Sequence, residues 1–146
     1  MFHAGISGAR GRMGRAVSQV LDARNDVVVS ARFDWGETAD LSLCDVVIDF
    51  STPEASVDLA RRAAEQGAPA LVIGSTGFSP EQEAELDKAA ERIAIVKGGN
   101  FSLGVNILIG LVEHAAMRLD AADWDIEIAE AHHRRKVDAP SGTALM

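Results

Sequence analysis

The sequence of 146 residues has little cysteine, few cations and no long apolar run. Its single cysteine, Cys44, cannot form an internal disulfide, which favours a reducing compartment. No apolar run approaches the roughly 20 residues of a membrane-spanning helix. Residues 1–4 also lack the charged-then-apolar order of a signal peptide. We therefore expect a cytoplasmic protein with no membrane partner, and a buried, structural Cys44.

Basic residues are fewer than acidic ones. The chain has 14 Lys and Arg and 22 Asp and Glu residues, which gives a net charge of −8. Nucleic-acid binding needs a basic surface, so this balance argues against a nucleic-acid partner. His3, Cys44 and His114 are not spaced as metal ligands, and we expect no metal site. The apolar fraction of 47% with 25% charged residues is that of a globular protein.

Short apolar runs alternate with helical patterns over the first hundred residues. This order is typical of an α/β fold with a parallel, Rossmann-like sheet that binds a nucleotide. Ser51 and Ser79 each begin a hydroxyl–proline–acid pattern that starts a helix. We predict strands at 2–7, 27–33, 45–50, 70–74 and 93–96, with helices at 15–23, after 51 and at 79–92.

The pattern changes after residue 98. A loop at 98–102 leads to an apolar helix at 105–119, and 124–131 alternates like a strand whose Ile126 and Ile128 face inward. We predict a dinucleotide-binding domain at 1–102. Residues 103–146 would then begin an α+β domain for substrate binding and oligomerisation, which is incomplete in this chain.

Three glycines follow the first predicted strand, Gly8, Gly11 and Gly14, and precede a helix. Glycines here let the backbone approach a pyrophosphate, which then meets the helix N-terminus. Asp34 follows the second strand, 20 residues after Gly14, where an acid binds ribose hydroxyls. A turn without a ligand is the alternative. We predict NADH or NADPH as cofactor, with NADH preferred because Asp34 repels a 2′-phosphate and Trp35 follows it.

Two further loops, 74–77 and 98–101, follow predicted strands. Ligands of open α/β sheets bind beyond the carboxyl ends of strands, so both loops would flank the nicotinamide. Ordinary turn chemistry is the alternative.

Residues 130–144 gather two adjacent imidazoles, three cations and a Pro-Ser-Gly-Thr turn in an acidic protein. His132 and Lys136 are suited to proton transfer to one substrate. Ser141 would cap a helix whose first N–H groups bind a carboxylate. A solvated basic turn before a capped helix is the alternative.

Taken together, these motifs resemble the dihydrodipicolinate reductase (4-hydroxy-tetrahydrodipicolinate reductase) family over essentially the whole chain. They are GxxGRMG at 8–14, Asp49-Phe50-Ser51 with Pro53, Gly74-Ser75-Thr76-Gly77, residues 100–104 and residues 130–144. Ser75 stands where the family usually has Thr, and Trp35 where NADP-using members tend to have Arg.

The resemblance implies an enzyme of lysine and diaminopimelate biosynthesis that reduces a cyclic dicarboxylate with NADH or NADPH. It implies His132 as catalytic acid/base and Lys136 as proton donor, with His133, Gly142 and Thr143 on the substrate carboxylates beside Ser141. The implied cofactor-lining residues are Gly8, Ala9, Arg10, Gly11, Arg12, Met13, Asp34, Gly74, Ser75, Thr76, Gly98, Gly99, Asn100 and Phe101.

The family continues for about a hundred residues beyond Met146 and is typically a tetramer, so we expect a homo-oligomer of the full-length protein. Two other hypotheses stay open. The chain could be a non-catalytic NAD(H)-binding module because it is truncated, or a different NAD(P)-dependent enzyme on the same fold.

Overall fold

The computed structural model describes residues 1–132, 134 and 139–146. Its contacts divide the chain into two compact units, Met1–Gly98 (unit 1) and Gly99–Met146 (unit 2). Within the described part, no helix is both long and apolar enough to cross a membrane. The predicted sheet lies in unit 1.

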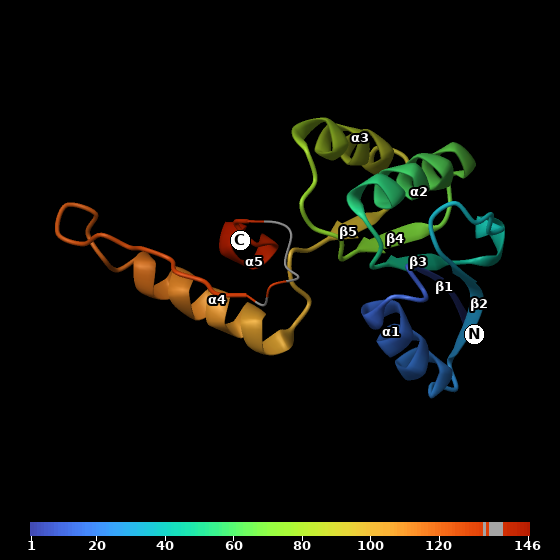
Figure 1. Ribbon diagram of the computed structural model, residues 1–146, viewed down its shortest axis with the longest axis horizontal. Coiled ribbons are helices and arrows are strands. Elements are labelled where there is room, and N and C mark those ends of the chain that lie inside the picture. Colours follow the sequence, from blue (N-terminus) through green and yellow to red (C-terminus); the bar gives the residue numbers. More distant parts are fainter. Residues whose placement is uncertain (133, 135–138) are drawn as a thin grey trace. The chain divides into compact units, whose positions relative to one another are not determined.

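Unit 1 is a parallel sheet with helices on both faces, which confirms the predicted α/β fold. Its strands are β1 (Phe2–Ser7), β2 (Val27–Phe33), β3 (Val46–Asp49), β4 (Ala70–Ile73) and β5 (Ile95–Lys97), and its helices are α1 (Arg12–Asp22), α2 (Pro53–Gln66), α3 (Pro80–Ala90) and the short 3-10 helix η1 (Leu41–Leu43). The strand order is β2-β1-β3-β4-β5. Helix α1 covers one face of the sheet, and α2 and α3 cover the other (Figure 1).

The starts of α2 and α3 follow the capping chemistry that the sequence predicts. Thr52 Oγ1 accepts a hydrogen bond from the N–H of Ala55 at 3.3 Å. Ser79 and Gln82 form a reciprocal capping box at the start of α3. Gly67 ends α2 in the left-handed conformation, with φ of 70°. These caps fix where both helices leave the sheet.

Several predicted boundaries are displaced. The helix predicted at 105–119 runs from Leu103 to Ala116, and two displacements in unit 1 have a clear local cause. Helix α1 begins at Arg12 rather than at residue 15, because Gly11 takes the extended conformation of an N-cap and its carbonyl accepts from the N–H of Arg15 at 3.0 Å. Strand β5 begins at Ile95, two residues later than predicted, since Ile93 is buried in the core before the strand starts.

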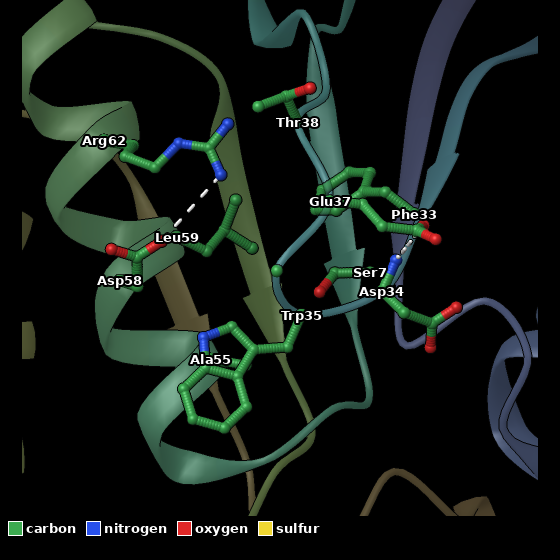
Figure 2. A pocket seen from close by; sticks show the side chains of 11 residues that line it. Ser7, Phe33, Asp34, Trp35, Glu37, Thr38, Ala55, Asp58, Leu59 and Arg62 are labelled. Carbon is green, nitrogen blue, oxygen red and sulfur yellow. Dashed lines mark hydrogen bonds and ion pairs between the residues drawn. The ribbon is translucent and has the colours of Figure 1, made fainter.

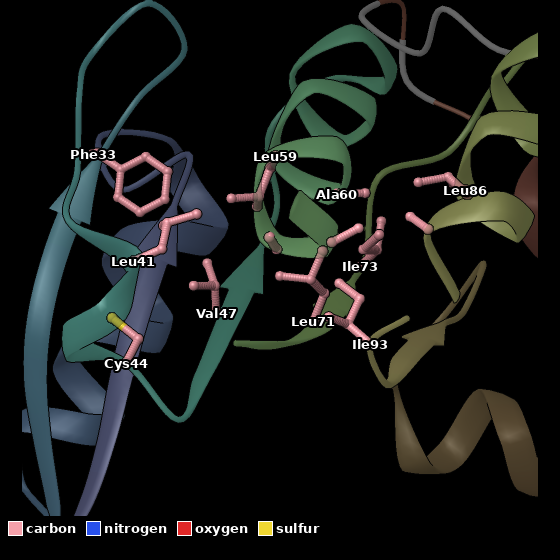
Figure 3. Close-up of a cluster of buried hydrophobic side chains, with 13 residues drawn as sticks. Phe33, Leu41, Cys44, Val47, Leu59, Ala60, Leu71, Ile73, Leu86 and Ile93 are labelled. Atoms are coloured by element: carbon pink, nitrogen blue, oxygen red, sulfur yellow. The ribbon is translucent and has the colours of Figure 1, made fainter. Parts of the chain in front are cut away.

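The core of unit 1 lies between the sheet and helices α2 and α3 (Figure 3). Val47, Leu71 and Ile73 face it from the central strands, and Leu59 and Leu86 face it from the helices. The continuous packing from β3 to α3 holds the carboxyl ends of the strands in a fixed arrangement.

Cys44 is 6% exposed and belongs to this core, which confirms its predicted burial. Burial raises the pKa of the Cys44 thiol, and the nearby carboxylates of Asp40 and Asp45 raise it further. A thiol in this environment stays protonated at neutral pH and is a poor nucleophile.

Unit 2 contains helix α4 (Leu103–Ala116), capped by Ser102, and the single-turn helix α5 (Gly142–Leu145), capped by Ser141. The strand predicted at 124–131 is wrong, because the segment has no strand assignment and His132 does not lie on a strand either. Ile126 and Ile128, expected to face inward, are 56% and 68% exposed. Alternating sequence forms a strand only beside a partner, and no strand of unit 2 is present in its described residues.

Candidate functional site

The carboxyl edge of the unit 1 sheet gathers the predicted cofactor residues of that unit. All five strands are parallel, so the loops after β1, β2, β4 and β5 lie at one edge. The strand order reverses between β1 and β3, which is where open α/β sheets bind ligands. The predicted residues at this edge are Gly8, Ala9, Arg10, Gly11, Arg12, Met13, Asp34, Gly74, Ser75, Thr76 and Gly98.

Two of the three predicted glycines, Gly8 in the loop after β1 and Gly14 in α1, are required by close backbone contacts. Gly8 has a φ of 72°, and a Cβ there would lie 2.5 Å from the carbonyl oxygen of Phe50. A Cβ on Gly14 would lie 2.1 Å from the carbonyl oxygen of Gly8. Any side chain at either position would therefore push α1 away from the switch point between β1 and β3.

Helix α1 starts at this edge without a side-chain cap. Its N-cap is Gly11, whose own N–H donates to the carbonyl of Gly8 at 3.0 Å. The N–H groups of the first turn, beginning at Arg12 and Met13, are left to solvent or to a ligand. Together with the helix dipole they form a binding site for an anion such as a pyrophosphate.

Two carboxylates stand beside this helix start. Asp34 follows β2 and accepts from the N–H of Arg10 at 3.3 Å, and it lies 3.4 Å from the Arg10 Nε. Glu37 binds the Arg10 guanidinium as well, and it accepts from the N–H of Asp34 at 3.0 Å. Arg10 is thus held by two acids. Asp34 was predicted from the sequence and Glu37 was not. Two acids three residues apart after a strand were the signal that could have identified Glu37.

A cavity of about 350 Å³ opens between the end of β2 and helix α2 (Figure 2). Trp35, 65% exposed, extends its indole toward the first turn of α2 near Ala55. On the far wall, Arg62 donates from Nη2 to the carbonyl of Ala39 at 3.2 Å. The lining residues are Ser7, Phe33, Asp34, Trp35, Gly36, Glu37, Thr38, Ala55, Asp58, Leu59 and Arg62. The lining residues on α2 could not be predicted from the sequence, because only the fold brings this helix to the carboxyl edge.

The loops after β4 and β5 are each held by a hydrogen bond within unit 1. Ser75 is nearly buried, and its Oγ lies 3.0 Å from the Oγ of Ser56 on α2. After β5, the N–H of Gly98 donates to the carbonyl of Ile73 at 3.1 Å. Both loops therefore keep defined positions beyond their strands.

In unit 2, Glu130 connects two predicted substrate-site residues. Its Oε1 accepts from the N–H of Ser141 at 2.8 Å, and its Oε2 accepts from the Ser141 hydroxyl. The same Oε2 lies 3.0 Å from Nε2 of His132. The Ser141 hydroxyl also accepts from the N–H of Ala144 at 3.1 Å, which confirms the predicted cap. No separate role was predicted for Glu130 from the sequence.

A second contact in unit 2 joins a predicted cofactor loop to the predicted substrate turn. Asn100 Nδ2 donates to Thr143 Oγ1 at 2.9 Å. A Cβ on Gly99 would lie 2.6 Å from the carbonyl oxygen of Gly142, so this position also needs glycine. His133 and Lys136 lie outside the described residues. Among residues 1–132, 134 and 139–146, no three His, Cys, Asp or Glu side chains are grouped as metal ligands.

Two family models match the chain. The model described as dihydrodipicolinate reductase, N-terminus, matches residues 2–101, and the one described as dihydrodipicolinate reductase, C-terminus, matches residues 104–146. The chain belongs to the dihydrodipicolinate reductase family. This membership confirms the resemblance drawn from the motifs.

Curated members of the family are similar over nearly the whole chain. The 4-hydroxy-tetrahydrodipicolinate reductase of Caulobacter vibrioides is 62% identical over 151 residues, covering 97% of this chain and 58% of that relative. The reductase of the same name from Rickettsia bellii is 46% identical over 153 residues, covering 100% of this chain and 59% of that relative. The chain thus spans less than two thirds of the length of these reductases.

A solved member of the family has a similar fold. The dipicolinate-bound dihydrodipicolinate reductase from Paenisporosarcina sp. TG-14 superimposes with a TM-score of 0.74 at 26% identity. The match covers 99% of this chain and 63% of that structure.

Proposed function

We propose that this chain provides the cofactor edge and the proton-transfer residues for NAD(P)H-dependent reduction of 4-hydroxy-tetrahydrodipicolinate to tetrahydrodipicolinate, a step of lysine and diaminopimelate biosynthesis. In net terms the substrate, the reduced cofactor and a proton become tetrahydrodipicolinate, the oxidised cofactor and water. The observation that carries the proposal is the uncapped start of α1, enclosed by Gly8 and Gly14 and flanked by Asp34. Family membership supplies the substrate class.

The residues at this edge fit a nicotinamide dinucleotide, which supplies a hydride when bound. The first N–H groups of α1 would hold the pyrophosphate, and Asp34 would accept from the ribose hydroxyls. The cavity beside Trp35 has the volume of a small-ligand site and would take the adenine. Gly74, Ser75 and Thr76, together with the contacts predicted at Gly98, Gly99, Asn100 and Phe101, would flank the nicotinamide.

Charge at the same edge supports a preference for NADH. A 2′-phosphate needs a free cation, and the guanidinium of Arg10 is paired with both Asp34 and Glu37. Arg32 is paired with Asp22 at 2.5 Å. A phosphate beside Asp34 would therefore meet two carboxylates and a guanidinium that both of them already hold.

Proton transfer would fall to His132 and Lys136, with His133, Ser141, Gly142 and Thr143 holding the substrate carboxylates. The contact between His132 Nε2 and Glu130 supports this role for His132. A carboxylate only accepts hydrogen bonds, so Nε2 carries the proton in this contact and Nδ1 is left for exchange with substrate. The division into a cofactor domain at 1–102 and the beginning of a substrate domain at 103–146 remains part of the proposal.

Turnover of the cyclic substrate tests the proposal. Loss of NADH absorbance would be followed for the chain and for a longer protein that contains it. We expect turnover in the longer protein at least, with a large fall in both His132→Ala and Lys136→Ala while NADH binding persists. Binding of NADH without turnover in either form would instead favour a non-catalytic NAD(H)-binding module. Light scattering on the longer protein would test the predicted tetramer.

A further inference from the structure

A buried carboxylate lies beneath the carboxyl edge of unit 1. Asp49 is the last residue of β3, and it is 0% exposed. In the described part of the chain, no ion pair includes Asp49. Burying a carboxylate is costly unless donors surround it, so hydrogen bonds must hold this one.

Three serine hydroxyls surround the Asp49 carboxylate. Ser51 donates to Oδ1 at 2.5 Å, and Ser56 on α2 donates to Oδ2. Ser75, in the loop after β4, has its Oγ 3.5 Å from Oδ2 and 3.0 Å from the Oγ of Ser56. Each hydroxyl has a single proton to donate. The Ser56 Oγ also lies 2.9 Å from the carbonyl of Thr52, a third acceptor for its one proton. The Ser75 Oγ faces both Asp49 Oδ2 and the Ser56 Oγ, so its hydroxyl is directed inward whichever of the two it bonds.

The main chain of the same loop is tied to the same strand. The N–H of Gly74 donates to the carbonyl of Asp49 at 2.8 Å. A Cβ on Gly74 would lie 2.1 Å from Cε1 of Phe50, so the Phe50 ring packs directly on the loop backbone. The contacts with Asp49 and Phe50 thus hold Gly74 and Ser75 at the start of this loop, and Asp49 is the charged residue of the two.

We propose that Asp49 is a positioning residue for cofactor binding. Through Ser56 and Ser75 it fixes the loop Gly74–Gly77 in the conformation that receives the dinucleotide. This role rests on the proposed function, because it requires that the carboxyl edge binds the cofactor. A purely structural role would instead confine Asp49 to joining β3 to the start of α2, through Ser51 and Ser56.

The dissociation constant of NADH separates these two roles. It would be measured by NADH fluorescence on the whole chain, alongside the midpoint of urea unfolding. The variants are Asp49→Asn, Ser75→Ala, their double mutant and Ser75→Thr, with Ser51→Ala as the matched control that removes the other donor to Asp49. If Asp49→Asn does not fold, Ser56→Ala takes its place, because Ser56 is the intermediate donor.

We expect Asp49→Asn and Ser75→Ala each to weaken NADH binding by roughly tenfold, the scale of one lost charge-assisted hydrogen bond. The double mutant should bind NADH about as tightly as the weaker-binding of the two single mutants, because both changes release the same loop. Ser75→Thr keeps the hydroxyl and should bind NADH more tightly than Ser75→Ala does. Ser51→Ala should lower stability yet leave the dissociation constant unchanged.

Unaltered NADH binding in Ser75→Ala, or an equal loss in Ser51→Ala, would overturn the positioning role while leaving the proposed function intact. If the unchanged chain itself bound no NADH, the proposed function would fail first, and this role would fail with it.

Discussion

At the scale of single residues, the ion pairs of Arg10 set the charge at the carboxyl edge of unit 1. Arg10 lies in the glycine loop, where a cation could attract phosphate, but Asp34 and Glu37 both hold its guanidinium. These pairs are partly exposed, so each contributes little to folding. In the proposed function these pairs act on cofactor choice, because they hold the guanidinium nearest to Asp34.

Replacing Glu37 by Gln should therefore shift the cofactor preference. The variant frees part of the Arg10 guanidinium, and we expect NADPH affinity to rise roughly two- to fivefold relative to NADH. Dissociation constants for both cofactors would be measured by fluorescence. Asp26→Asn is the control, because it removes an exposed ion-pair partner at the opposite edge of the sheet. An unchanged ratio of the two affinities in Glu37→Gln would contradict this account of selectivity.

Cys44 gives a pH dependence whose sign follows from its raised pKa. The folded protein holds the thiol proton more tightly than the unfolded chain does. The stability from this group is therefore complete below the unfolded pKa, about 8.5, and is lost as pH rises through the folded pKa. Above about pH 8.5, the free energy of unfolding in urea should fall more steeply with pH for the unchanged chain than for Cys44→Ala. Parallel curves for the two proteins would be the contrary result.

At the scale of elements, substitution of glycine by alanine should lower the stability at Gly14 in α1 and raise it at Gly110 in α4. A Cβ at Gly14 would lie 2.1 Å from the Gly8 carbonyl, whereas a Cβ at Gly110 would meet nothing within 4 Å. We expect Gly14→Ala to lose about 1–3 kcal/mol of stability and most NADH affinity. Gly110→Ala should gain about 0.5–1 kcal/mol and bind NADH normally. Chemical denaturation and NADH titration would check both; normal NADH affinity in Gly14→Ala would show that the close contact is not needed.

Local chemistry explains which elements the sequence could predict. The bounds of β1 and β2 and the helix start at Ser79 were predicted correctly, because flanking polar residues and caps encode them locally. The strand expected at 124–131 failed, because a strand depends on a neighbour that a single segment does not encode. The residues Ala55, Asp58 and Arg62 were missed for the same reason, since α2 reaches the cavity only through the fold.

At the scale of the whole molecule, the two units differ in how they bury apolar side chains. Unit 1 encloses a core, whereas α4 in unit 2 has no buried residue. Its exposed apolar residues, on the helix and just before and after it, are Phe101, Leu103, Ile107, Leu108, Leu111, Val112, Met117 and Leu119. Exposed apolar residues gathered on one element are typical of a site that other protein covers, and we predict that role for α4.

The dye ANS should report this surface. Leu111 on α4 and Val20 on α1 are almost equally exposed, at 62% and 63%, but only Leu111 belongs to an extended apolar surface. Leu111→Gln should lower ANS fluorescence of the chain, and Val20→Gln should leave it nearly unchanged. Equal effects of the two substitutions would show that α4 has no special apolar surface.

Amide hydrogen exchange with and without NADH tests the central claim most directly, because it locates the cofactor on the sheet. We predict that NADH slows exchange at residues 8–14, 34–37 and 74–76, at the carboxyl edge. The opposite edge, where Met1, Phe2, Asn25 and Asp26 line a separate cavity, should exchange at the same rate with and without NADH. Protection confined to that opposite edge, or no protection at the carboxyl edge under saturating NADH, would contradict the account.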